Sequence, residues 1–173
     1  MTDTQMEPRN ECVERDAARL QEQVIAFIRS FGLLRPNATP CGRPLSVSEA
    51  YALLELSRRG GWSQAALGHR LRLEKSTISR LINQLQGKGW VERTRNPADG
   101  RAVRLRLTEQ GSQVADQVAV ARSDYFARLI ERIPAAERED VVGAFQVMVE
   151  ALEGQDMVSF NENEAEWDER GEV

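Results

Sequence analysis

The fold is decided by one continuous stretch, which runs from Glu74 to Gly111 and reads EKSTISRLINQLQGKGWVERTRNPADGRAVRLRLTEQG. Its first part, about Lys75 to Gln86, carries apolar residues at the three- and four-residue spacing of an amphipathic helix, whereas the polar residues between them point elsewhere. The apolar stripe consists of Ile78, Leu81, Ile82 and Leu85. Gly87 and Gly89 then end the predicted helix.

The second part of the stretch predicts a β-hairpin. Two segments, Trp90 to Arg95 and Arg101 to Leu107, are separated by Asn-Pro-Ala-Asp-Gly at positions 96–100. Val103, Leu105 and Leu107 alternate with Arg104 and Arg106, which is the period of a strand. The sequence therefore predicts a hairpin with basic arms.

A shorter helix precedes this stretch. Ser63 follows Trp62 and precedes Leu67, a pattern typical of an N-cap with a hydrophobic staple. We expect a helix from Gln64 to Leu71 with Ala65, Ala66 and Leu67 facing inward, and a tight turn at Arg72 to Glu74. Two short helices joined by such a turn form a helix-turn-helix, whose second helix can enter the major groove of DNA.

Longer helices are predicted on both sides. Ser46 and Glu49 fit a capping box ahead of a helix whose apolar side is Tyr51, Leu53, Leu54 and Leu56. Apolar stripes also predict a first helix from Glu14 to Phe31, a long helix after Thr108 and a last helix after Pro134. These stripes contain Leu20, Val24, Phe27, Ile28 and Phe31, then Val114, Val118, Tyr125 and Leu129, and finally Val141, Phe145, Met148 and Leu152. The expected fold is mainly α with one β-hairpin.

Charge is unevenly distributed along the 173 residues. The net charge is −4, yet positions 58–106 hold 12 basic residues against Glu74, Glu92 and Asp99, a balance of +9. The tail from Glu150 holds nine acidic residues and Arg170. A basic middle between acidic ends predicts a localised polyanion-binding surface. We expect a cytoplasmic, nucleoid-associated protein without membrane contact, because no apolar stretch reaches the length of a membrane span.

The side chains on the outer face of the predicted second helix suit DNA contact. Asn83 and Gln84 can pair with adenine edges, Arg80 with guanine or a phosphate, and Ser76 and Thr77 can approach closely at the helix N-terminus. Lys75 on this helix, and Ser63 and Gln64 on the preceding one, complete the expected contacts. A solvated helix face is the alternative interpretation. The hairpin favours DNA, because its basic residues can straddle phosphates: Arg93, Arg95, Arg101, Arg104 and Arg106.

Positions 67–72 and 74–111 closely resemble the helix-turn-helix and wing of the multiple-antibiotic-resistance-regulator (MarR) family. The resemblance is strongest over 45–111 and extends over 14–153. We expect this range to form one winged helix-turn-helix domain, between a flexible N-terminus (1–13) and an acidic, disordered tail (154–173). The resemblance implies that Arg101 at the wing tip enters the minor groove while Asp99 holds it or a neighbouring arginine. The alternative for Asp99 is a turn residue that caps backbone. It also implies that helices 14–31 and 108–153 form a homodimer, whose DNA site would be a pseudo-palindrome.

The leading hypothesis is a ligand-responsive regulator, more often a repressor in this family, in which a small molecule changes the spacing of the two recognition helices. A thiol switch at Cys12 or Cys41, or a winged-helix dimer that binds only proteins, are the alternatives. Acidic neighbours, Glu11 and Glu14, disfavour a reactive thiolate at Cys12, and no basic partner is visible in the sequence. The single histidine, His69, argues against a metal site. No enzyme motif or cofactor-binding motif is present, so we predict neither catalysis nor a cofactor.

Overall fold

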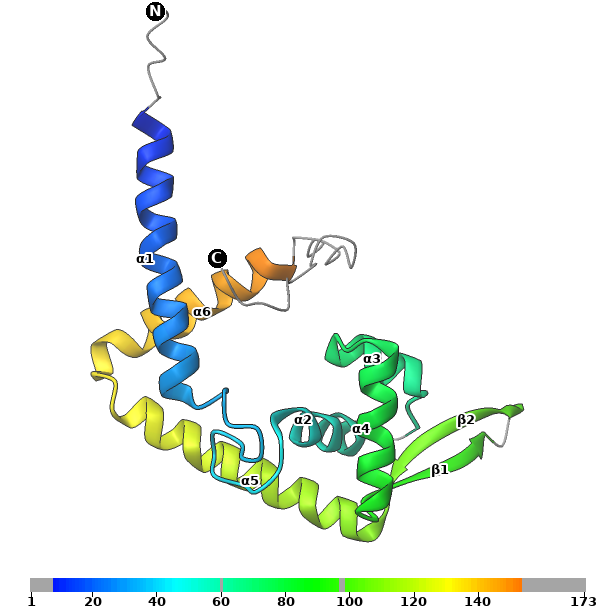
Figure 1. Cartoon of the computed structure of the whole chain (residues 1–173). Coiled ribbons are helices and arrows are strands. Elements are labelled where there is room, and N and C mark those ends of the chain that lie inside the picture. Colours follow the sequence, from blue (N-terminus) through cyan, green and yellow to red (C-terminus); the bar gives the residue numbers. More distant parts are fainter. Residues whose placement is uncertain (1–7, 60, 97–98, 154–173) are drawn as a thin grey trace, which may run out of the picture. The chain divides into compact units, whose positions relative to one another are not determined.

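The computed structural model describes residues 8–59, 61–96 and 99–153, with side chains over 11–59, 61–94 and 103–153. The chain is mainly helical and forms the predicted winged helix-turn-helix (Figure 1). The elements, in order, are α1 (Pro8–Phe31), α2 (Val47–Arg58), α3 (Gln64–Leu71), α4 (Lys75–Gly87), β1 (Val91–Asn96), β2 (Asp99–Leu107), α5 (Glu109–Glu131), the 3-10 turn η1 (Ala135–Glu137) and α6 (Arg138–Glu153). Two compact units, Met1–Phe126 and Ala127–Val173, are described separately below.

Local capping signals start the helices of the first unit where the sequence predicts. Ser46 and Glu49 form the expected capping box: the Ser46 hydroxyl accepts from the Glu49 amide (3.2 Å) and the Glu49 carboxylate from the Ser46 amide (2.9 Å). The Ser63 hydroxyl accepts from the Ala66 amide at 3.1 Å, which fixes the start of α3. Each bond satisfies an amide that would otherwise lack a partner at a helix N-terminus.

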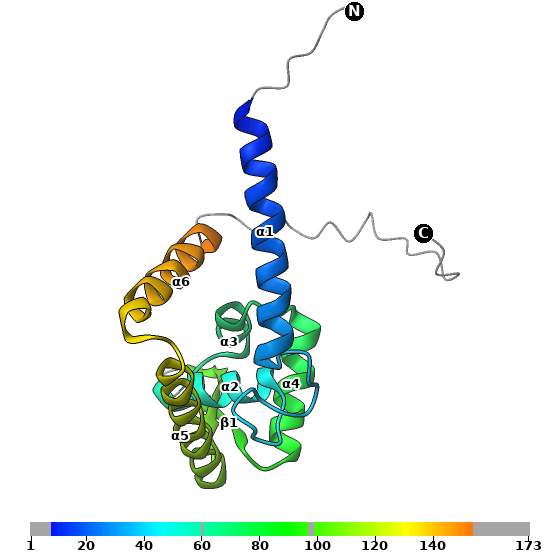
Figure 2. The ribbon, with the colours of Figure 1, turned by 90° about the vertical axis from the view of Figure 1, so that its left-hand side faces the viewer.

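The core of the first unit lies between α2, α3, α4 and the hairpin. All four residues of the predicted α4 stripe are buried. They pack with Leu53 and Leu56 of α2, Leu67 of α3 and Leu105 of β2 in one cluster. Figures 1 and 2, related by a 90° turn, show the helices α2, α3 and α4 close to one another. Burial of leucine and isoleucine side chains, each contributing about 1.5–3 kcal/mol, holds the helix-turn-helix together.

The strands β1 and β2 form an antiparallel hairpin that extends beyond the helices (Figure 1). Arg93 lies opposite Leu105 and Glu92 opposite Arg106, with a register shift between Arg95 and Asn96. Trp62, in the segment between α2 and α3, pairs with Leu105 on the other edge of β2. The hairpin is therefore anchored at its base to the helix-turn-helix.

Close backbone packing joins the hairpin base to α5. Thr108 donates its amide to the Trp90 carbonyl (3.1 Å) and its hydroxyl to the Gly89 carbonyl (2.7 Å), and this hydroxyl accepts from the Gly111 amide (3.0 Å). The predicted cap at Thr108 is thus present. A Cβ added to Gly111 would lie 1.9 Å from the Trp90 carbonyl oxygen, so only glycine fits at this crossing.

Three local expectations differ from the structure. The first helix begins at Pro8 rather than Glu14, so part of the predicted flexible N-terminus is helical, with proline at a position where its missing N–H costs nothing. Ala65 and Ala66 are exposed, because consecutive helical residues point about 100° apart and α3 buries only Leu67 and Gly68. Tyr51 is 50% exposed at the edge of the core.

The second unit contains the end of α5, η1 and α6. Pro134 is the N-cap of η1, so the break predicted at this proline is present. None of the 16 residues of α6, all within the described part of the chain, is buried. Val142, Val147, Val149 and Leu152 are each at least 47% exposed. The division at Phe126 falls inside α5, and the single domain expected over 14–153 stays a prediction.

Candidate nucleic-acid interface

The outer face of α4 carries the side chains that the sequence selects. Its apolar residues face the core, which leaves the polar ones exposed: Lys75, Ser76, Thr77, Arg80, Asn83 and Gln84. Arg80 folds back along the helix, with its Nε donating to the Ser76 carbonyl at 3.4 Å. The structure therefore brings the six candidates of this helix together on one solvent-facing surface.

The N-terminus of α4 is open to an anion. Within the described residues around this end, Glu74 occupies the N-cap position and its side chain makes no capping hydrogen bond. The exposed Ser76 and Thr77 lie in the first turn, where free amides and the helix dipole favour a negative group. A phosphate oxygen is a suitable partner for such an end.

One arginine of β1 connects this surface to α3. The Nη2 atom of Arg93 donates to Gln64 Oε1 and to Asn83 Oδ1, each at 3.2 Å. All three residues are candidates for DNA contact, and the structure brings them together from three elements. Their separation of up to 29 positions leaves no local sequence signal for the contact.

Two other candidates have partners within the chain. Arg104 donates its Nη1 to the Gly61 carbonyl at 2.6 Å, at the turn between α2 and α3. Gly61 has φ +82°, and a Cβ here would lie 3.3 Å from Arg104 Cδ, so the close approach also favours glycine. The Ser63 hydroxyl is the α3 cap. DNA contact by Arg104 and Ser63 stays a prediction, and the side chains of Arg95, Asp99 and Arg101 lie outside the described residues.

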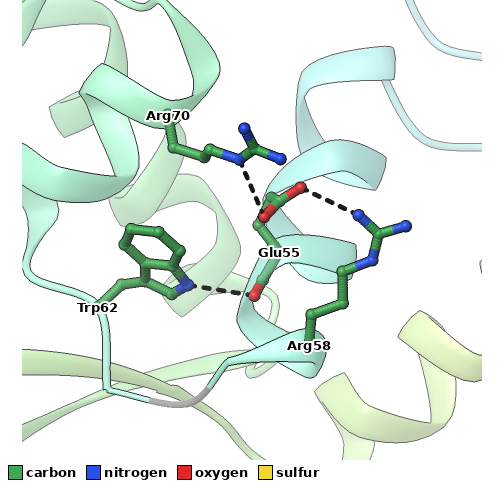
Figure 3. Close-up of polar contacts among 4 residues, drawn as sticks. All are labelled: Glu55, Arg58, Trp62 and Arg70. Carbon is green, nitrogen blue, oxygen red and sulfur yellow. Dashed lines mark hydrogen bonds and ion pairs between the residues drawn. The ribbon is translucent and has the colours of Figure 1, made fainter.

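Acidic residues of α2 reduce the positive charge expected for positions 58–106. Glu55 accepts from Arg70 Nε at 3.3 Å and from Arg58 Nη1 at 3.5 Å, while its backbone carbonyl accepts from the Trp62 indole at 3.1 Å (Figure 3). The buried Glu49 pairs with Lys88 Nζ at 2.5 Å. Both carboxylates lie before position 58, so the sequence window missed them. Of the 12 basic residues in this window, Arg58, Arg70 and Lys88 therefore have acidic partners.

A pocket that sequence reasoning missed lies away from this surface. It is partly open to solvent, has a cavity volume of about 50 Å³ and is mainly apolar. The aromatic rings around it are in mutual contact: the centroid of the Phe31 ring lies 5.5 Å from that of Tyr125 and 5.8 Å from that of Phe126. The pocket is lined by Phe31, Leu33, Thr39, Pro40, Cys41, Val47, Ala50, Tyr51, Leu54, Val118, Arg122, Tyr125 and Phe126. Its lining comes from the ends of α1 and α5, from α2 and from the loop between α1 and α2, so no short motif marks it.

The two cysteines have different surroundings. Cys12 is exposed on α1, where Arg15 Nη2 lies 3.5 Å from its sulfur and Asp16 Oδ2 lies 3.7 Å from it. The expectation that Cys12 lacks a basic partner is therefore wrong, because a residue three positions ahead returns to the same helix face. Cys41 is half-buried in the pocket wall, with its sulfur 3.1 Å from Thr39 Oγ1.

Among the described residues, no helix is long and apolar enough to cross a membrane. In the same part of the chain, no cluster of three or more His, Cys, Asp or Glu side chains is placed to hold a metal ion.

Comparison with known proteins agrees with the geometry. The family model described as "MarR family" matches residues 44–102. The HTH-type transcriptional regulator Mb0904 of Mycobacterium bovis is 28% identical over 135 residues, which cover 78% of this chain and 91% of that protein.

Two solved regulators share the fold. The PcaV transcriptional regulator of Streptomyces coelicolor, also crystallised with its natural ligand, matches with a TM-score of 0.59 and 24% identity over 82% of this chain and 98% of its own. Streptococcus pneumoniae FabT, solved in complex with DNA, matches with a TM-score of 0.60 and 18% identity over 86% of this chain and 99% of its own. The exposed α4 of this chain, its hairpin wing and the family match over residues 44–102 support a MarR family regulator of the winged helix-turn-helix, DNA-binding type.

Proposed function

We propose that this regulator is a homodimeric repressor that binds a pseudo-palindromic DNA operator and leaves it when a small molecule binds. The observation that carries the proposal is the outer face of α4, where six polar residues lie exposed around an open helix N-terminus and beside Arg93. A helix of this kind fits the major groove, and a twofold dimer presents two of them. The two half-sites are then about 10 base pairs apart, centre to centre.

Exposed apolar side chains on the flanking helices support the dimer. On α1, Leu20 is 51% exposed, and on α6 Val142 and Val147 are 59% and 65% exposed. Monomeric proteins rarely leave large apolar patches in water, and a second copy of the chain would cover these exposed side chains. The same helices are those that the family resemblance assigns to the dimer.

The pocket between the α1–α2 loop and α5 supports the response to a small molecule. Its walls are aromatic and aliphatic, and Arg122 supplies a positive charge at its lining. An apolar, ring-containing organic anion fits this chemistry, because the ring can pack on Phe31 and Tyr125 while Arg122 binds the anionic group. A ligand there would bear on α2 and α5 at once. A small change in the spacing of the two recognition helices would then prevent both from docking.

The test is selection of fragments from the source genome with purified protein, followed by anisotropy measurements on the enriched sequence. The expected result is selective, salt-dependent binding to a two-part site. Arg80→Ala should weaken it, whereas Arg35→Ala removes the same charge from an exposed residue of the loop between α1 and α2 and serves as the matched control. Absence of any enriched sequence, with a folded protein, would reject the proposal.

A thiol switch is the second candidate, and the position of Cys41 in the pocket wall favours it over Cys12. Oxidation of Cys41 would add a polar oxygen inside an apolar pocket and would change its packing. Peroxide treatment should then lower operator affinity in the wild type and in Cys12→Ser, but not in Cys41→Ser. Equal affinity before and after treatment in all three proteins would exclude this candidate.

A further inference from the structure

Arg93 has a position in the hairpin that separates it from the other arginines of the wing. It lies two residues after the buried Val91 and opposite the buried Leu105, so it leaves β1 on the face that packs against the helices. Arg106, opposite Glu92, lies on the other face. Arg93 therefore extends across the helix surface, where it reaches Gln64 of α3 and Asn83 of α4.

The chemistry of this contact fixes the orientation of two carboxamides. A guanidinium group donates hydrogen bonds and accepts none, so the oxygens of Gln64 and Asn83 must face Arg93. Nη2 carries two hydrogens, one for each oxygen. The NH2 group of Asn83 is then turned away from Arg93, on the exposed face of the recognition helix.

We propose that Arg93 is a positioning residue for Asn83, which holds the carboxamide so that its NH2 group points away from the hairpin and donates to the N7 acceptor of a purine in the major groove. This inference rests on the proposed function. The oxygen of Asn83 keeps a second lone pair beside the one that Arg93 uses, so adenine, which also needs an acceptor for its amino group, and guanine, which offers O6 beside N7, both fit this orientation. Arg93 itself acts through Asn83 and Gln64 rather than through a phosphate.

The experiment uses the operator enriched by the wild-type protein and every single base-pair change within one half-site, at several salt concentrations. The key variant is Arg93→Lys, which keeps the charge but loses the two-hydrogen fork. We expect it to keep the salt dependence and to lose roughly tenfold discrimination at one purine, the same one at which Asn83→Ala loses it. Replacing that purine by its 7-deaza analogue should weaken the wild type and leave Asn83→Ala unaffected.

Arg106→Ala is the matched control, because it removes an arginine from the opposite face of the same hairpin. Arg106→Ala should lower the affinity for all operator variants by one common factor. If Arg106 touches a phosphate, the slope of log affinity against log salt concentration should become shallower by about 0.9. A double variant, Arg93→Lys with Asn83→Ala, should discriminate no worse than Asn83→Ala alone. Full discrimination in Arg93→Lys, or an Arg93→Ala effect that is uniform and adds to that of Asn83→Ala, would overturn the inference and make Arg93 a phosphate contact.

A second measurement needs no DNA. The Asn83 side-chain amide signals, identified in NMR spectra by their absence in Asn83→Ala, should shift in Arg93→Lys of the free protein and stay in place in Arg106→Ala. Unshifted signals in Arg93→Lys would also overturn the positioning role. A wild-type protein that selects no DNA sequence rejects the proposed function instead, and the two failures are thus distinguishable.

Discussion

The helix-turn-helix and α6 use apolar residues in opposite ways. Around the helix-turn-helix, Leu53 of α2, Leu67 of α3 and Ile82 of α4 are fully buried, so these helices share a core within one chain. In α6, which the structure describes in full, no residue is buried, and four apolar side chains are each at least 47% exposed. The difference separates a winged helix-turn-helix with its own core from a helix whose apolar side chains face solvent in the single chain. Substitutions in the two regions should therefore have different consequences.

The largest effect is expected at the joint between the hairpin base and α5. Gly111→Ala places a carbon 1.9 Å from the Trp90 carbonyl oxygen, and the backbone at Trp90 is itself held by Thr108. The clash cannot be relieved by rotating a side chain, so we expect a loss of more than about 4 kcal/mol in the free energy of unfolding. Chemical denaturation followed by circular dichroism measures it.

Gly143→Ala in α6 is the matched control for this substitution. Nothing described lies within 4 Å of a Cβ at Gly143, so alanine should stabilise the helix by up to about 1 kcal/mol. Similar changes in the two variants would contradict the contrast between a closed joint and an open helix.

A smaller effect, about 2–5 kcal/mol, is expected when the core of the helix-turn-helix loses a buried side chain, as in Leu67→Ala. The same loss in the free energy of unfolding should appear at every protein concentration, because the cavity lies inside one chain.

Val147→Asp changes an exposed residue of α6 and should mainly raise the dissociation constant of the dimer, as measured by analytical ultracentrifugation. If Val147→Asp left the oligomeric state unchanged, α6 would not be part of the interface.

Features that depend on neighbouring positions could be predicted from the sequence. The caps at Ser46, Ser63 and Thr108 act over three residues, and the α4 stripe has the helical period, so both are visible in the order of residues. The exposed set on α4 follows from the stripe, because a helix that buries one face leaves the other to solvent.

Contacts between distant positions could not be predicted. Glu49 and Lys88 are 39 positions apart, and Arg93 is 29 positions from Gln64, so only the folded chain brings them together. The pocket likewise combines residues from Phe31 to Phe126. The prediction that Arg104 contacts DNA did not foresee its bond to Gly61, because a backbone carbonyl carries no sequence signal.

The next prediction concerns the buried carboxylate of Glu49, which is 2% exposed and accepts from the Ser46 amide and from Lys88. Glu49→Gln keeps the shape but removes the charge, and one amide hydrogen then faces the lysine. We expect a loss of about 1–3 kcal/mol, because a charge-assisted bond in a buried site is broken while Lys88 can still reach water. Lys88→Met, which leaves the carboxylate buried without its partner, should cost at least as much; a neutral result for both would show that the pair contributes nothing.

The smallest effect is expected at Glu55, although it joins α2 to α3 through two arginines (Figure 3). The side chains of Arg58 and Arg70 are 61% and 57% exposed, and such ion pairs contribute about 1 kcal/mol or less. Glu55→Gln should therefore lower the free energy of unfolding by less than about 1 kcal/mol, and added salt should shrink the difference. The Trp62 indole keeps its bond to the Glu55 backbone carbonyl in this variant, whereas Trp62→Phe loses that bond and part of the ring packing and leaves the ion pairs intact. If Glu55→Gln lowered the free energy of unfolding more than Glu49→Gln, burial would not determine how strongly these ion pairs stabilise the winged helix-turn-helix.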